Sequence, residues 1–75
     1  MKQLVKPVSE QNLRKLRQAQ GLSLWGLAVR AGTSPTVLSA IERWNYRPGA
    51  DLRTRIARAL GVRVADIWPA EEVQG

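Results

Sequence analysis

The stretch AGTSPTVLSAIERW, from Ala31 to Trp44, places a helix end and a helix start within three residues of each other. Glycine adopts the left-handed conformation that closes many helices, so Gly32 predicts a helix end. Ser34 is a favourable N-cap, and Pro35 fits the first helical position because its missing N–H would have no partner there. The stretch therefore predicts two short helices joined by a tight turn.

Similar signals divide the rest of the chain into helices. Ser9 and Ser23 are placed to cap the first two helices, and Gly21 and Gly61 are placed to end helices. No alternating apolar run of strand length occurs, so the pattern predicts an all-α fold. The predicted helices span residues 9–20, 23–31, 34–43, 50–60 and 64–68. The residues expected to face the core are Leu13, Leu16, Leu24, Leu27, Ala28, Ala31, Leu38, Ile41, Leu52, Ile56 and Leu60.

Charge is the feature of the composition that indicates a partner. The 75 residues include 12 Lys and Arg against 6 Asp and Glu, a formal net charge of +6. A small basic domain attracts polyanions, and nucleic acid is the usual one. The alternative is that the charge only keeps the protein in solution.

The residue types that are missing exclude several other functions. Without cysteine the chain has neither disulfides nor a thiolate zinc site, and without histidine it lacks the commonest general base. The scattered carboxylates form no nucleophile–base set, so we expect no enzymatic activity, no cofactor and no metal. No apolar run approaches the roughly 20 residues that span a bilayer, which predicts one soluble domain.

Two short helices joined by a tight turn have two interpretations. They form either a helix-turn-helix, whose second helix can lie in the major groove of DNA, or an ordinary helical hairpin within a bundle. The spacing of the turn does not by itself separate these alternatives.

Several segments together resemble the helix-turn-helix domains of lambda repressor and Cro, the Cro/C1-type or XRE family. The matching text is LRKLRQAQGLS, LAVRAGTS, LSAIERW, a loop with Pro48, and RIARALGV, from about Asn12 to Trp68. The resemblance implies a compact five-helix lambda repressor-like bundle, double-stranded DNA as partner, DNA binding by the third helix, and usually a homodimer on a two-fold operator. It also implies a cytoplasmic protein, associated with the nucleoid when bound to DNA.

The resemblance implies a structural role for one charged pair. Similar domains pair a glutamate late in the third helix with an arginine late in the first, and Glu42 and Arg17 match these positions. A carboxylate in the last turn opposes the helix dipole, so Glu42 needs such a partner. The chain departs from the family pattern at Leu24, where glutamine is common, and at Trp44, where small residues usually follow the third helix.

The third helix is expected to present a face of short side chains. At 100° per residue, Thr36, Ser39, Ala40 and Arg43 lie opposite its apolar residues. The methyl groups of Thr36 or Ala40 can contact a thymine methyl, and Arg43 can bind guanine or a phosphate, of which we favour the phosphate. Further contacts to the DNA are expected from Arg30, Thr33, Ser34, Pro35, Asn45, Tyr46 and Arg47.

We expect the other arginines and the tryptophans to have structural rather than DNA-binding roles. Arg55 and Arg58 are expected to be solvated, with Arg55 paired to Asp51 across one helical turn. Arg53 falls near the buried flank of its helix and needs a partner. We expect core or core-edge packing for each tryptophan, whereas exposed aromatic residues would indicate a protein partner. The tryptophans are Trp25, Trp44 and Trp68.

We divide the chain into an N-terminal arm (1–8), a helix-turn-helix domain (9–69) and a C-terminal tail (70–75). The arm either follows DNA through Lys2 and Lys6, or uses its apolar residues to pack on the domain or to add a strand to a partner; we favour packing or disorder. We predict a DNA-binding transcriptional regulator, most simply a repressor of phage or mobile-element type. The alternative is a protein-interaction module on the same scaffold that binds through exposed aromatic residues.

Overall fold

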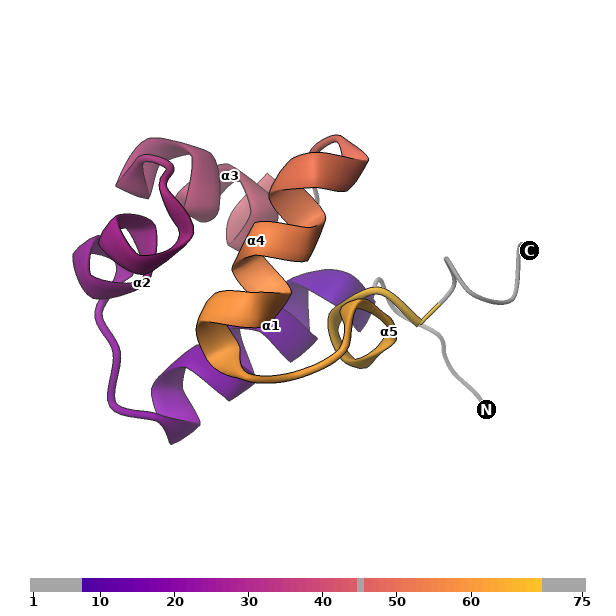
Figure 1. Ribbon diagram of the computed structural model, residues 1–75, viewed down its shortest axis with the longest axis horizontal. Helices are drawn as coiled ribbons and strands as arrows, with labels where there is room; N and C mark the ends of the chain where they lie inside the picture. Colours follow the sequence, from indigo (N-terminus) through magenta and orange to yellow (C-terminus); the bar gives the residue numbers. More distant parts are fainter. Residues whose placement is uncertain (1–7, 45, 70–75) are drawn as a thin grey trace.

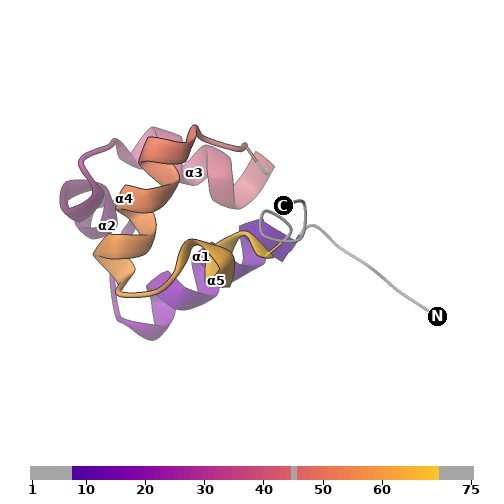
Figure 2. The ribbon, with the colours of Figure 1, turned by 45° about the vertical axis from the view of Figure 1, so that its right-hand side comes forward.

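The computed structural model describes residues 8–44 and 46–69, and within them every regular element is a helix. The helices are α1 (Val8–Ala19), α2 (Leu24–Ala31), α3 (Pro35–Trp44), α4 (Ala50–Leu60) and α5 (Val64–Ile67). Figures 1 and 2 show α5 beside α1, and the C-terminal end of α4 directed away from α3. The predicted all-α fold of five helices is confirmed. No described helix has both the length and the apolar character needed to cross a membrane.

The helix ends follow the predicted caps with small differences. The Ser23 hydroxyl accepts a hydrogen bond from the Gly26 N–H at 3.0 Å. The Ser34 hydroxyl accepts one from the Val37 N–H at 3.2 Å. The prediction for Ser9 is wrong, because α1 begins at Val8 and Ser9 therefore lies inside the helix. Apart from Val8, the predicted N-terminal arm lies outside the described residues, as does the predicted tail.

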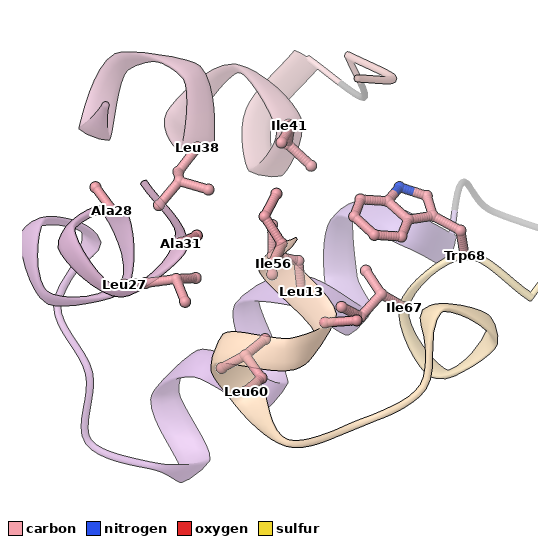
Figure 3. Close-up of a cluster of buried hydrophobic side chains, with 11 residues drawn as sticks. Leu13, Leu27, Ala28, Ala31, Leu38, Ile41, Ile56, Leu60, Ile67 and Trp68 are labelled. Carbon is pink, nitrogen blue, oxygen red and sulfur yellow. The ribbon is translucent and has the colours of Figure 1, made fainter. Parts of the chain in front are cut away.

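The core lies where the apolar sides of all five helices meet. α1 packs against α3 and α5, and α2 packs against α3 and α4. Leu38 and Ile41 extend from α3 towards Ile56 of α4 (Figure 3). Trp68, which is 5% exposed, closes the core after α5 as predicted. Leu38 and Ile41 thus hold the inner side of α3 to the core.

Polar side chains satisfy several backbone carbonyls at helix ends and in loops. Gln20 Nε2 donates to the Leu60 carbonyl at 2.7 Å, and Arg53 Nη1 donates to the Pro48 carbonyl at 2.7 Å. Arg53 is half-buried, as its position in the sequence predicted. These bonds join segments that the small core alone would hold weakly.

The structure corrects the expectation that Arg55 is only a solvated charge. Arg55 forms the predicted ion pair with Asp51, at 3.2 Å, but it is not merely solvated. Its Nη1 also donates to the carbonyls of Ala31 and Gly32, at 3.2 and 3.0 Å. The arginine on α4 therefore caps the C-terminal end of α2, where the turn towards α3 begins.

Substitutions at two glycines can measure how much the Arg55 cap contributes to the free energy of unfolding. Gly32 and Gly21 both have positive φ, 71° and 69°, but a Cβ on Gly32 would lie 2.9 Å from Arg55 Nη1, whereas one on Gly21 meets nothing within 4 Å. We expect Gly21→Ala to lower the free energy of unfolding by about 1–2 kcal/mol for the left-handed backbone. Gly32→Ala should lower it by about 1 kcal/mol more, because Arg55 must give up its bonds to the carbonyls.

Chemical denaturation of the two variants measures the difference. Combining each substitution with Arg55→Met should remove the excess cost of Gly32→Ala and leave the cost of Gly21→Ala unchanged. Equal losses for the two single variants would contradict the capping role of Arg55.

Candidate nucleic-acid interface

The inner side of α3 is tied to α1 by a buried ion pair. Arg17 donates from Nε to Glu42 Oε2 at 2.7 Å and from Nη2 to Oε1 at 2.9 Å, a two-pronged geometry. The side chain of Glu42 is 2% exposed and that of Arg17 is 11% exposed. The structure therefore brings together the two residues that the family resemblance had paired.

Neighbouring groups complete this pair. Arg17 Nη1 donates to the Leu22 carbonyl at 2.9 Å, and Arg14 approaches Glu42 to 3.7 Å from the surface. The hydrogen bonds to Glu42 raise the pKa of Arg17 above its ordinary value, against the opposite effect of burial. Arg17 therefore stays charged, and the rotation of α3 about its own axis is fixed by bonds as well as by packing.

The opposite side of α3 faces solvent. Thr36 and Arg43 are exposed, and Ser39 and Ala40 are half-buried. We call these four residues the outward face of α3. Its side chains offer hydroxyl and methyl groups and one guanidinium group, which are groups that can contact base edges in a major groove.

The turn before α3 provides donors at the N-terminus of that helix. Pro35 lacks an N–H, and the N–H of Val37 donates to the Ser34 hydroxyl. Among the first three residues of α3, the N–H of Thr36 is therefore the one that can donate to a ligand. The cap uses a lone pair of the Ser34 hydroxyl and leaves its proton for another acceptor. The backbone N–H of Thr33 is not available, because it donates to the Ala28 carbonyl at 2.9 Å. Only the hydroxyl of Thr33 can therefore serve the contact predicted for this residue.

The loop after α3 is held in place at both ends. The N–H of Tyr46 donates to the Ala40 carbonyl at 3.2 Å, and Pro48 is fully buried. Tyr46 and Arg47 are exposed between these anchors, and Arg30 is exposed on α2. Asn45, also predicted to contact DNA, lies outside the described residues.

The exposed aromatic residues overturn another expectation. Trp25 is 69% exposed and Trp44 is 75% exposed, so core packing is the wrong prediction for both. Trp25 lies beside Val29 on the solvent side of α2, and Trp44 is the last residue of α3. Trp44 lies beside the outward face and was not among the residues expected to contact DNA. Its position, four residues after Ala40, was the available signal.

Comparisons with known proteins agree with this geometry. A family model described as helix-turn-helix matches residues 13–67. An uncharacterized HTH-type transcriptional regulator of Methanothermobacter thermautotrophicus is 38% identical over 61 residues, covering 80% of this chain and 88% of the relative. One from Methanocaldococcus jannaschii is 33% identical over 60 residues, covering 80% and 91%. The chain belongs to the Cro/C1-type helix-turn-helix family.

Solved structures with a similar fold include other regulators. The restriction-modification controller protein C.AhdI of Aeromonas hydrophila superposes with a TM-score of 0.74 at 29% identity, covering 81% of this chain and 94% of that one. The N-terminal DNA-binding domain of SinR from Bacillus subtilis superposes with a TM-score of 0.76 at 28% identity, covering 84% and 93%. This helix-turn-helix protein is therefore a DNA-binding transcriptional regulator.

Breaking the ion pair should lower stability strongly. Arg17→Met leaves the Glu42 carboxylate buried without its two-pronged partner, which we expect to lower the free energy of unfolding by about 3 kcal/mol. The melting temperature should fall by more than about 10 °C for a domain of this size. Thermal unfolding followed by circular dichroism measures this.

Arg58→Met is the matched control, since Arg58 is exposed on α4 and should change stability by no more than about 0.5 kcal/mol. The double variant Arg17→Met/Glu42→Leu removes both charges and should lose less than the sum of the two single variants. An unchanged melting temperature in Arg17→Met would rule out a structural role for the pair.

Proposed function

We propose that the protein regulates transcription by docking α3 in the major groove of duplex DNA with its outward face against the base edges. The arrangement of α3 supports this proposal, because its inner side is bonded to α1 while its outer side carries short side chains that are exposed or half-buried. A helix approaches base edges closely when its outer side chains are short. Such a role places the protein in the cytoplasm, at the nucleoid.

Phosphate contacts supply most of the affinity in this proposal. The N-terminus of α3 offers the Thr36 N–H, the Ser34 proton and the positive end of the helix dipole, which suit a phosphate oxygen. Exposed residues on both sides of the outward face can bind the two backbones of the groove. The proposed phosphate-binding residues are Arg30, Thr33, Ser34, Arg43, Tyr46 and Arg47, and Pro35 shapes the turn.

Salt dependence tests this assignment. With about four phosphates neutralised, the logarithm of the binding constant should fall with the logarithm of salt concentration with a slope near −3.6. Arg43→Ala should reduce the slope by about 0.9 if Arg43 binds a phosphate, and should instead relax base preference if it binds guanine. Fluorescence anisotropy with labelled duplexes at several salt concentrations measures both quantities.

Arg58→Ala removes the same charge from the end of α4 that is directed away from α3, and it should keep the slope of the wild type (Figure 1). Salt-insensitive binding, or a failure of the wild type to bind any duplex at low salt, would contradict the proposal.

We further propose that two copies act together on a two-fold site. One outward face with a single long side chain discriminates among few bases, and a second copy doubles the length of DNA that is contacted. A duplex with two inverted half-sites about one helical turn apart should bind two protomers in analytical ultracentrifugation, with higher affinity than a single half-site. Equal affinities per protomer for the two duplexes would argue against cooperation between copies.

The comparisons do not favour the narrower prediction of a repressor of phage or mobile-element type. They also lend no support to the alternative of a protein-interaction module. Both remain predictions from the sequence, and regulation through DNA binding is the function that the geometry favours.

A further inference from the structure

The C-terminal end of α3 carries a large aromatic side chain that the core does not use. Trp44 is 75% exposed and lies eight residues after Thr36 and four after Ala40. Residues spaced by four lie nearly above one another on a helix. Thr36, Ala40 and Trp44 therefore form one inclined row, which turns by about 80° around α3 from Thr36 to Trp44 and which we call the apolar row.

The apolar row runs beside a polar one. Ser39 and Arg43 are also four residues apart, and they lie on the other side of Thr36 and Ala40 around the helix. The N–H of Tyr46 binds the Ala40 carbonyl at 3.2 Å, which fixes the end of the helix next to Trp44. The two rows thus present different chemistry to whatever lies against α3: methyl groups and an indole on one side, a hydroxyl and a guanidinium on the other.

We propose that the apolar row contacts thymine methyl groups on consecutive base pairs, and that Trp44 is a specificity-determining residue for the last of them. The inference rests on the proposed function. The thymine methyl is the one apolar group among the base edges of the major groove, so it is the natural partner of methyl and indole groups. The half-site therefore contains a thymine-rich stretch.

The length of the row sets the length of this stretch. Eight residues of α-helix rise about 12 Å. Base pairs of B-DNA are spaced about 3.4 Å apart. A helix tilted so that this inclined row follows the groove brings the row against about four base pairs, with Thr36 at one end and Trp44 at the other.

Deoxyuridine provides a direct test, since it pairs like thymidine but lacks the methyl group. A duplex selected from a random library by the wild-type protein is compared with copies in which single thymidines are replaced by deoxyuridine. We expect selected half-sites to share three or four consecutive thymines, and each replacement beneath the row to weaken binding about four-fold. Wild-type protein that binds both kinds of duplex equally overturns the inference.

Matched variants assign individual contacts. Thr36→Ser keeps the hydroxyl and removes the methyl, whereas Thr36→Val keeps a methyl and removes the hydroxyl. Sensitivity to deoxyuridine at one position should disappear in Thr36→Ser and persist in Thr36→Val. The reverse pattern overturns the role of the Thr36 methyl.

Trp44 is tested in the same way. Trp44→Ala should lose the four-fold sensitivity at the thymine farthest from Thr36, whereas Trp25→Ala, at a similarly exposed residue of α2, should retain it. Retention in Trp44→Ala overturns the assignment of Trp44. If the wild type binds no duplex even at low salt, the proposed function fails together with this inference. If the wild type binds duplexes in a salt-dependent way but is insensitive to deoxyuridine, this inference fails and the proposed function stands.

Discussion

The position of α3 depends on the bidentate bond between Arg17 and Glu42. A carboxylate that is 2% exposed in the last turn of a helix is unfavourable twice, through desolvation and through the helix dipole. It is tolerated because Arg17 meets both of its oxygens, at 2.7 and 2.9 Å, from a neighbouring helix. An apolar pair would fill the same space without directional bonds. The ion pair acts together with the packing of Leu38 and Ile41 to fix which side chains of α3 face outward.

Arginine side chains also stabilise the fold elsewhere, by donating to backbone carbonyls, and this affects what the net charge says about a partner. Arg53 binds the Pro48 carbonyl and Arg55 binds those of Ala31 and Gly32, while Arg17 is committed to Glu42 and Leu22. A chain of 75 residues without disulfides has a small core, and these charge-assisted bonds supplement it. Part of the basic composition is therefore structural. Of the 12 Lys and Arg, Arg17, Arg53 and Arg55 are committed to the fold, so fewer cations are available to phosphates than the composition alone suggests.

Local signals predicted the helices well because they act over a few residues. Ser23 and Ser34 cap where serine was expected to cap, and Gly32 and Gly61 close helices with positive φ. Long-range bonds had no such signal. Nothing near Arg55 in the sequence indicates carbonyls 23 and 24 residues away, so it was taken for a solvated charge. The exposed tryptophans were missed for a related reason, since tryptophan is usually buried and its exposure depends on which side of a helix the other helices cover.

The short side chains of the outward face impose a condition on the rest of the molecule. Hydroxyl and methyl groups extend only a short way from the backbone, so α3 must enter the groove deeply before they touch a base. Deep entry is possible only if the elements on either side of α3 stay clear of the DNA backbone or bind to it. Arg55 and Arg53 bind the carbonyls of Gly32 and Pro48, and so help to fix the turn before α3 and the loop after it. In the proposed docking, these two arginines therefore help to determine how closely the outward face of α3 can approach a base.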